Sequence, residues 1–366
     1  MTATLGEFTR WLEELIPPVF QEHYDNSGLQ VGDPDAVVNS VLLSVDVTAE
    51  VIAEAREYHC NLIISHHPLI FTPLKRIAGG SETERCVASA VRAGIAIYSA
   101  HTSFDNLSWG VSHILAEKIG LTKIRVLAPL KGKLSKLITF VPVAHSGRVR
   151  EALFAAGAGK IGNYDRCSFN VTGDGTYRAG EGADPFAGKV GEDHTEQEIR
   201  IEAVMPSHLS PACVRALIMA HPYEEVAYDI IALENEYHGA GAGAIGTLPA
   251  PLTVTMLLEK LKELTGIQVI RYSGDPARTV TTVAVCGGSG SDLISTAARA
   301  GADAFVTGDV KYHAFTQAPD DMIVADIGHY ESEKFSLELL YDLINKKFPK
   351  FALRFSGIKT NPINYY

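Results

Sequence analysis

The sequence predicts an α/β protein in which one domain is inserted into another, and three observations support this. Short apolar strands alternate with helices toward both ends of the chain, a pattern typical of parallel sheets that are covered on both faces. The middle of the chain instead has the order β-α-β-β-α-β, which is typical of a ferredoxin-like α+β unit. Residues 41–68 and 283–310 share the lengths of a strand, a turn, a helix and a second strand, which indicates two related halves of one discontinuous domain.

The length of the chain also favours two domains, because its 366 residues exceed what a single hydrophobic core usually serves. We place the outer α/β domain, with its parallel-type sheets, at residues 1–128 and 235–366. The inserted domain then spans residues 129–234. A β-α-β-β-α-β segment of this length could fold as a unit.

The N-terminal part of the outer domain begins with a helix over 5–16, since its apolar residues have helical spacing and Pro17-Pro18 ends it. The elements that follow are short apolar strands and amphipathic helices in alternation. We expect strands at 41–45, 61–65 and 95–99 and helices at 48–58 and 82–94.

The inserted domain shows strand and helix periodicity in its own order. We expect strands at 136–143, 167–172, 198–205 and 226–233 and helices at 147–157 and 209–221. Residues 173–193 are rich in Gly, Asp and Glu. They predict a long, exposed and mobile hairpin loop.

The alternation resumes after a Gly- and Ala-rich linker at 238–246. The expected helices are 252–265, 291–301 and a long amphipathic helix at 331–348, and the expected strands are 281–288, 303–308 and 322–326.

Composition excludes several classes of protein. With 46% apolar and 20% charged residues the chain is a globular protein and not a disordered one. It has no run of about 20 apolar residues and no signal-peptide pattern, so we expect a cytoplasmic protein without membrane contact. A net charge of −11 makes nucleic acid an unlikely partner. The five scattered cysteines predict reduced thiols, so any metal must use histidine and carboxylate ligands.

Histidines gather at the ends of four strands of the outer domain. Ligands of open parallel sheets bind at the carboxyl ends of the strands. The segments there are 65–71, 99–106, 307–313 and 325–333. Every one contains a histidine, and three of them contain an aspartate just beyond the strand. The sequence therefore predicts a cluster of histidine and carboxylate groups at one edge of the sheet.

Two of these segments supply paired candidates. His66 and His67 leave their strand on opposite sides, so they can reach two different points. His329 and Glu333 are four residues apart at the start of a helix and share one of its faces, while Glu331 points elsewhere. The alternative for Glu331 and Glu333 is that they only complement the helix dipole. The clustering at the other strand ends favours metal ligation.

The third segment supplies two weaker candidates. Taken alone, Asp105 is better explained as a helix cap or a turn-forming aspartate. His101 alone is equally consistent with a partly buried, hydrogen-bonded histidine. Both gain weight only from their position beside the other strand ends.

The ligand types narrow the choice of metal. Three histidines with an aspartate and a glutamate suit Zn, Fe, Mn, Co or Ni and are too rich in nitrogen for Ca or Mg. Five ligands exceed what one catalytic ion usually receives, and a bridging carboxylate would let them hold two ions. Two ions about 3.5–4 Å apart can share a water and keep it as hydroxide at neutral pH.

The segment GGSGSD at 287–292 lacks the third glycine of a dinucleotide site and the lysine of a P-loop, so it predicts a tight strand–helix turn.

These motifs, in this order, resemble the Nif-three-like family of GTP cyclohydrolase 1 type 2 homologs. The resemblance is carried by DNSGLQVGD (25–33), SHHPLIF, SAHTSFDN, TGDVKYH and DIGHYESE. Segments 157–169 and 220–230 are similar to the PII/CutA-like insert of the longer bacterial members. The resemblance implies a dinuclear site in which His67, Asp105 and Glu333 hold one metal. His66 and His329 would hold the second, with Glu333 bridging. It also implies a toroidal homohexamer with its metal sites facing an internal cavity.

The resemblance implies a metal-dependent hydrolase that opens the imidazole ring of GTP, or acts on another nucleotide, at a cyclic amidine C–N bond. Water activated by the metal pair would attack, and His101 and His313 would act as catalytic proton carriers. Lys311 and Arg76 could meet phosphate, although each is equally an ordinary surface charge. The alternatives are a metal-binding regulatory protein and a hexameric scaffold without catalysis.

Overall fold

The computed structural model describes residues 3–366, which form two compact units. The outer unit contains the chain up to Ala128 and again Gly239–Tyr366, and the inserted unit is Pro129–His238. The expected boundaries are 128/129 and 234/235, so the second one lies four residues from its expected place. That the units fold independently stays a prediction.

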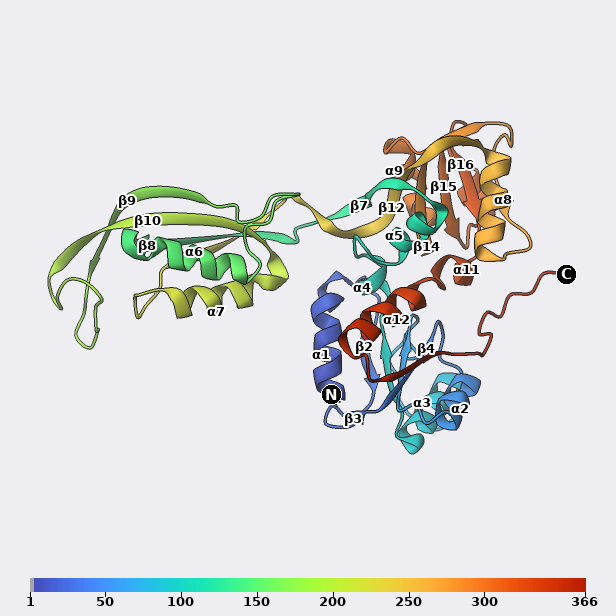
Figure 1. Cartoon of the computed structure of the whole chain (residues 1–366), viewed down its shortest axis with the longest axis horizontal. Coiled ribbons are helices and arrows are strands. Elements are labelled where there is room, and N and C mark those ends of the chain that lie inside the picture. Colours follow the sequence, from blue (N-terminus) through green and yellow to red (C-terminus); the bar gives the residue numbers. More distant parts are fainter. Residues whose placement is uncertain (1–2) are drawn as a thin grey trace. The chain divides into compact units, whose positions relative to one another are not determined.

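The first sheet of the outer unit, whose strands β2 and β4 are labelled in Figure 1, has the strand order β17-β4-β5-β6-β2. Its strands are β2 (Gly28–Val31), β4 (Ser40–Ser44), β5 (Leu62–Ser65), β6 (Ala96–Ser99) and β17 (Ala352–Phe355). Only β2 runs antiparallel to its neighbour. Helices α2 (Ala49–Glu57) and α3 (Glu82–Ala93) connect the central strands and pack over Leu42, Ile63 and Ile97. The expected strand–helix alternation is present here.

The N-terminal helix α1 (Leu5–Leu15) begins as its sequence predicts. Thr4 accepts a hydrogen bond from the Glu7 amide, and Glu7 accepts one from the Thr4 amide, which together form a capping box. Two short strands, β1 (Ala3–Thr4) and β3 (Val37–Val38), pair beside it. The buried side chains of Leu5, Phe8 and Leu12 attach α1 to the core.

The second sheet of the outer unit has the order β13-β16-β15-β14-β12-β7. Its strands are β7 (Thr122–Lys131), β12 (Glu236–Thr253), β13 (Arg271–Tyr272), β14 (Thr279–Ser289), β15 (Ala304–Gly308) and β16 (Ile323–Asp326). Strands β14, β15 and β16 are parallel, whereas β12 is antiparallel to β14 and β13 is antiparallel to β16. The α/β class is therefore confirmed, but both sheets are mixed and not purely parallel.

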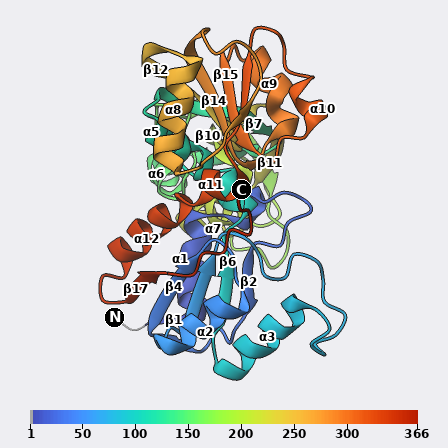
Figure 2. The ribbon, with the colours of Figure 1, turned by 90° about the vertical axis from the view of Figure 1, so that its right-hand side faces the viewer.

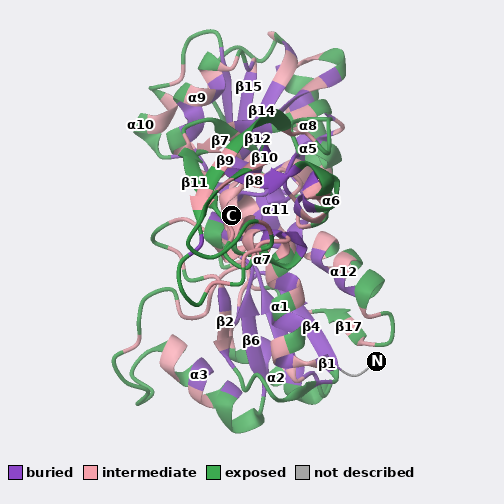
Figure 3. Cartoon of the chain, turned by 90° about the vertical axis from the view of Figure 1, so that its left-hand side faces the viewer, coloured by how far each residue is buried: buried purple, intermediate pink, exposed green. Residues whose placement is uncertain are grey.

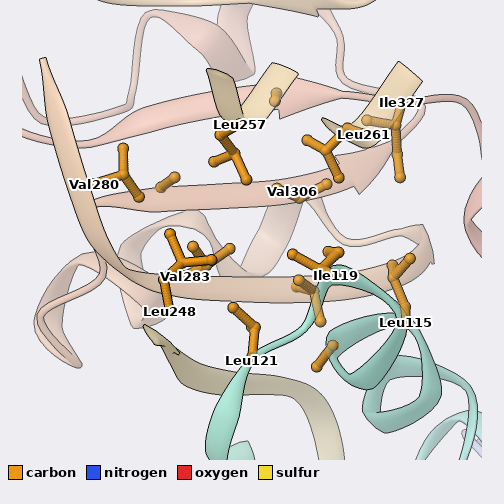
Figure 4. Packing of buried hydrophobic residues seen from close by; sticks show 14 of the residues in the cluster. Leu115, Ile119, Leu121, Leu248, Leu257, Leu261, Val280, Val283, Val306 and Ile327 are labelled. Carbon is orange, nitrogen blue, oxygen red and sulfur yellow. The ribbon is translucent and has the colours of Figure 1, made fainter. Parts of the chain in front are cut away.

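Helices cover both faces of this second sheet. On one face α5 (Val111–Ile119) and α8 (Val254–Thr265) bury Leu115, Ile119, Leu257 and Leu261 against the strands (Figure 4). On the other face α9 (Ile294–Arg299) packs on Phe305 and its neighbours. The central strands of both sheets are buried (Figure 3).

The two sheets are built on the same unit. In the first, β4, α2 and β5 form a strand, helix and parallel strand, and in the second β14, α9 and β15 do the same. The expected likeness of residues 41–68 and 283–310 has this structural counterpart.

The predicted linker at 238–246 is wrong, because these residues belong to β12. The strand lies between β14 and β7, and its Ala244 and Ile245 are buried. A Cβ added at Gly246 would lie 2.9 Å from the Thr122 carbonyl oxygen, so a glycine lets the two backbones approach. The small residues that suggest a flexible linker in the sequence instead allow neighbouring strands to pack closely in the fold.

The predicted helix at 331–348 is two helices, α11 (His329–Glu333) and α12 (Ser336–Lys347). At the break the backbone changes to shorter-range hydrogen bonds, from the Leu337 amide to the Lys334 oxygen and from the Glu338 amide to the Phe335 oxygen. Because of the break, α11 can pack against β14 and β15 of the second sheet while α12 contacts β4 and β17 of the first.

The inserted unit has the predicted order of elements. It contains β8 (Leu134–Pro142), α6 (Ser146–Ala155), β9 (Phe169–Arg178), β10 (Asp193–Pro206), α7 (Ser210–Ala220) and β11 (Tyr228–Leu233). The sheet order β11-β8-β10-β9 is antiparallel throughout, and α6 and α7 bury Leu153 and Leu217 on one face. Strand β9 is longer than expected, so the hairpin loop begins at residue 179. The more specific likeness to PII and CutA proteins stays a prediction.

Two further features match the sequence. All five cysteines are unpaired. Within residues 3–366, every helix is too short or too polar to cross a lipid bilayer.

Candidate metal centre

Three strand ends bring the candidate ligands of the outer unit together. His66 and His67 directly follow β5, and Asp105 ends the short helix α4 (Thr102–Asp105) after β6. His329 and Glu333 are the first and last residues of α11, which follows β16 and lies between the two sheets (Figure 2). Each half of the outer unit therefore supplies part of one cluster, as expected for loops at the carboxyl ends of strands.

The first group of ligand atoms joins His67, His329 and Glu333. The Nε2 atoms of the two histidines lie 3.2 Å apart. Glu333 Oε2 lies 3.0 Å from Nε2 of His67 and 3.2 Å from Nε2 of His329. Nitrogen and oxygen ligands at 2.0–2.2 Å from one ion are themselves about 3.0–3.5 Å apart. The three atoms are thus spaced like ligands of a single metal ion.

The second group joins His66, Asp105 and Glu333. Nε2 of His66 lies 3.5 Å from Oδ1 of Asp105 and 3.5 Å from Oε1 of Glu333. His66 is fully buried and Glu333 is only 2% exposed. Glu333 belongs to both groups, with one carboxylate oxygen facing each.

Several polar atoms in these groups have no hydrogen-bond partner. They are His66 Nε2, Asp105 Oδ1 and Glu333 Oε2, all of them buried. A buried polar atom without a partner costs about 1–3 kcal/mol, and more when it is charged. Two imidazole nitrogens that face each other across 3.2 Å also compete, since only one of them can donate to the other. A divalent cation would satisfy all of these atoms, so the residues fit a metal.

Each histidine is oriented through its other ring nitrogen. Nδ1 of His67 lies 2.7 Å from Asp46, and Nδ1 of His329 lies 2.7 Å from Asp309. Nδ1 of His66 lies 3.0 Å from the Ala100 carbonyl oxygen. Histidines that ligate metals typically donate their second N–H to a carboxylate or carbonyl in this way. The contact fixes the tautomer that leaves Nε2 free to ligate.

The carboxylates in these contacts were missed by the sequence reasoning. Asp46 follows the strand at 41–45, so the rule of strand ends would have found it had that strand been included. Asp309 and Asp25, which contacts Nδ1 of His101, both lie within segments that the sequence singled out. Spacing alone does not pair either of them with a particular histidine, because each pair joins segments that are distant in the chain.

The sequence-derived partition of the ligands differs from the structure. The resemblance places His67 with Asp105 and His66 with His329, whereas the structure groups His66 with Asp105 and His67 with His329. The two adjacent histidines do join different carboxylate-containing groups, as their alternation on the strand predicts. Which of them meets His329 depends on how the two sheets pack. Glu331 points away from both groups and accepts a hydrogen bond from Asn361.

His101 lies at the edge of the cluster. With His66 and His67 it forms a third group of potential ligands, whose ligand atoms lie within 4.8 Å of one another. Nδ1 of His101 contacts Asp25 at 2.7 Å, so Nε2 is the atom left for other partners. His313, in contrast, is exposed on the short helix α10 (Tyr312–Phe315) and belongs to none of the three groups of potential ligands. Lys311 and Arg76 are exposed as well. The roles expected for these three residues stay predictions.

The electrostatics of the cluster favour the protonated forms of His67 and His329 when no metal is bound. Burial opposes protonation of His67, but the nearby carboxylates of Asp46 and Glu333 outweigh it and raise its pKa to about 10. Burial likewise opposes protonation of His329, and Glu333 and Asp309 raise its pKa to about 9. Burial disfavours the Glu333 anion, yet the neighbouring histidines hold its pKa well below the usual range. Protons therefore compete with a metal for the same nitrogen atoms.

A glycine makes room for the shared carboxylate. Gly288 has a φ of +65°, and a Cβ there would lie 2.1 Å from Oε1 of Glu333. Its amide donates a hydrogen bond to Ser332 Oγ at 2.9 Å, next to Glu333 in α11. The predicted tight turn at 287–292 thus has a second role, because it allows α11 to bring Glu333 to the cluster.

Comparisons with known proteins agree with this architecture. The family model described as Duf34/NIF3 (NGG1p interacting factor 3) matches residues 3–362. A Bacillus subtilis protein named GTP cyclohydrolase 1 type 2 homolog is 38% identical over 364 residues, which cover 96% of each chain. A Halalkalibacterium halodurans protein of the same name is 37% identical and covers 98% of this chain and 96% of its own.

Solved structures show the same likeness. The crystal structure of a Bacillus cereus protein related to NIF3 superposes with a TM-score of 0.88 at 36% identity, over 99% of both chains. A Staphylococcus aureus protein superposes with a TM-score of 0.78 at 27% identity, also over 99% of both. The resemblance drawn from the strand-end motifs is confirmed, and the chain belongs to the Duf34/NIF3 family.

Proposed function

We propose that the chain holds two divalent metal ions that share Glu333 and that it uses them to hydrolyse a nucleotide-like substrate. One observation carries the proposal. The buried carboxylate of Glu333 directs Oε1 toward His66 and Oε2 toward His67 and His329. A carboxylate placed between two sets of ligands is the arrangement that a bridged metal pair requires.

The ligand sets follow from these distances. His66, Asp105 and Glu333 would hold one ion, and His67, His329 and Glu333 the other. Their mixture of imidazole and carboxylate suits Zn, Fe, Mn, Co or Ni. When bound, such a pair lowers the pKa of water and neutralises negative charge that develops on a substrate.

The residues around the ligands have separate tasks. Asp46, Asp309 and the Ala100 carbonyl keep three imidazoles in the tautomer that ligates. His101, whose Nδ1 contacts Asp25, would carry a proton between the substrate and solvent through Nε2. Proton transfer of this kind contributes about 10²–10⁴-fold to a rate.

GTP is the first substrate to test, because the relatives are named GTP cyclohydrolase 1 type 2 homologs. Hydrolysis of the guanine imidazole ring needs attack by water and protonation of the nitrogen that leaves. Metal-replete protein should release formate from GTP, and His67→Ala should abolish the release.

His101→Ala and His313→Ala should lower turnover and retain the metals. Loss of metal in either variant would place that histidine among the ligands.

The metal content tests the dinuclear site directly. Native protein should contain two ions per chain by elemental analysis. Glu333→Gln should lose both ions, while Asp105→Asn should weaken mainly one. Glu331→Gln is the matched control on the same helix, since its side chain contacts Asn361 and not the cluster. One ion or none in the metal-replete native protein would contradict the proposal.

A metal-binding regulatory protein is the second candidate. The inserted unit favours it, because that unit has its own core around Leu137, Ile201 and Leu217 and holds none of the candidate ligands. Tight metal binding without turnover on a panel of nucleotides would favour this function over hydrolysis. A scaffold without catalysis would give the same result but would require a protein partner.

A further inference from the structure

The inserted unit contains a cavity that the metal chemistry does not use. Its volume is about 510 Å³, which is within the range of small-molecule sites. It is lined by residues of β9, of β10 and of the hairpin loop that joins them. Figure 1 labels these two strands. We call this cavity the insert cavity, and its principal lining residues are Phe140, Tyr177, Phe186, Glu198, Tyr223 and Glu224.

Aromatic rings form the walls of the insert cavity. The ring centroids of Tyr177 and Tyr223 are 6.1 Å apart with planes inclined by 63°. Phe186 and Tyr223 are 5.9 Å apart and inclined by 47°. Rings inclined at such angles do not stack face to face on one another. The Tyr177 hydroxyl donates to the Ala187 carbonyl at 2.7 Å, which ties this wall to the hairpin loop.

A buried carboxylate lies against these rings. Glu198 is 8% exposed, and its Oε1 accepts a hydrogen bond from the Tyr223 hydroxyl at 2.8 Å. A Cβ on Gly175 would lie 2.2 Å from Oε2, so the glycine makes room for the carboxylate. Burial, and then the hydrogen bond to Glu198, raise the pKa of Tyr223, which keeps the phenol a donor.

The charge around the insert cavity is negative. Besides Glu198, the lining includes the carboxylates of Asp174, Glu224 and Glu225, and Arg178 is the one basic residue among the described lining residues. These acids are absent from the three groups of described residues whose atoms could hold a metal ion. Their arrangement therefore does not favour a metal. Aromatic faces combined with carboxylates are instead the chemistry that recognises organic cations.

We propose that the insert cavity binds an organic cation, with its ammonium or guanidinium group on Glu198 and its apolar body between Tyr177, Phe186 and Tyr223. The pairing of one buried anion with several ring faces compensates a desolvated cation better than either could alone. This site is separate from the metal centre, since all of the candidate metal ligands belong to the outer unit.

Three probes of one shape and different charge test the proposal. They are 2-phenylethylammonium, neutral 2-phenylethanol and anionic 3-phenylpropanoate, each titrated into the full-length protein by calorimetry and saturation-transfer NMR. The cation should bind saturably, and the other two should bind at least about tenfold more weakly. Binding should be the same after chelation of metals, which separates the insert cavity from the metal centre.

Variants then assign the binding to the insert cavity. Glu198→Gln keeps the shape and an acceptor for Tyr223 but removes the charge, and it should weaken the cation about tenfold or more. Glu234→Gln is the matched control, because Glu234 is exposed in the same unit and does not line the cavity. Phe186→Ala removes a ring at a half-exposed loop position and replaces Glu198→Gln if that variant does not fold. Failure of the cation to bind, equal binding of the neutral probe, or unchanged binding in the folded variant would overturn the proposal.

Discussion

At the scale of single residues, the candidate metal centre depends on side chains whose positions are already set by their protein neighbours in the metal-free protein. Glu333 is buried at the end of α11 and contacts three histidines. A buried carboxylate is tolerated only when charges or hydrogen bonds compensate it. In the metal-free protein His67 and His329, whose pKa values are raised, provide this compensation, and in the metal-bound protein the ions would provide it.

Asp46 gives the first prediction at this scale. Asp46→Asn keeps the size of the side chain but weakens its hold on Nδ1 of His67, without removing any ligand. Metal affinity at one site should fall about 10–100-fold. Competition with a fluorescent chelator measures the loss, and Asp33→Asn, at an exposed position away from the cluster, serves as the control. Unchanged affinity in Asp46→Asn would show that the orientation of His67 does not depend on this contact.

The raised pKa values of His67 and His329 give a prediction about pH. A histidine whose pKa rises from 6.5 to about 9 or 10 on folding stabilises the metal-free fold fully below pH 6.5 and loses that effect as the pH rises through the higher value. Metal binding requires the same nitrogens without protons, so affinity rises over this window. The difference in melting temperature between metal-loaded and metal-free protein should therefore grow from pH 6.5 to 9. A difference that is constant with pH would contradict the assignment of these histidines as ligands.

At the scale of elements, short turns decide where the ligands lie. The backbone turn at the end of β14 lets α11 approach, since Gly288, the last but one residue of this strand, combines a positive φ with the absence of a side chain beside Glu333. Helix α11 ends after five residues, and the chain then passes to α12. A continuous helix would tie the direction of α11 to that of α12, whereas the break lets each helix pack on its own sheet.

Gly288→Ala tests the role of this turn. The added methyl group meets the Glu333 carboxylate, so the variant should lose metal and also lose about 1–3 kcal/mol of unfolding free energy through backbone strain. Gly301→Ala is the matched control, because Gly301 has a φ of +79° with no atom within 4 Å of the added Cβ. It should show the strain alone and keep its metal. Equal metal content in the two variants would argue against a steric role for Gly288. Thermal melts and elemental analysis give both readings.

At the scale of the whole molecule, the chain separates two tasks. The outer unit holds all of the candidate metal ligands, and the inserted unit holds the insert cavity. Strands β7 and β12 carry the chain out of the outer unit and back into it, and they are neighbours in one sheet. The inserted unit therefore leaves and returns at adjacent positions, which is typical of an inserted domain.

Excision of the inserted unit tests this separation. Replacing 132–235 by a short Gly/Ser linker leaves the paired parts of β7 and β12 in place. The product should be soluble and should bind the same number of metal ions as the full chain, by elemental analysis and circular dichroism. An unfolded product would show that the outer unit needs the inserted one. Loss of metal from a folded product would mean that the inserted unit supports the centre.

Assembly is the second prediction at this scale. We propose that the chain forms a homohexamer, as its family resemblance implies, and exposed apolar side chains such as Phe169 and Val171 are consistent with contacts between copies. Sedimentation should give six times the chain mass of 39.5 kDa. A monomer at micromolar concentration would contradict this.

The sequence by itself determined the order of the elements and the strand ends at which chemistry could occur. Hydrophobic periodicity is local, so it located the β-α-β-β-α-β insert and the alternating strands and helices around it. The rule that ligands gather at the carboxyl ends of strands then selected His66, His67, Asp105, His329 and Glu333 without knowledge of their distances.

Only the tertiary structure decided which of these residues meet. The grouping of His67 with His329, the contact of Asp46 with His67 and the ring walls around Glu198 all join segments that are far apart in the chain. The same holds for residues 238–246, which become a strand because two neighbouring strands are there to pair with them. Periodicity reports on each segment separately, whereas these contacts depend on how sheets and turns pack against one another, and that packing is settled only when the whole unit folds.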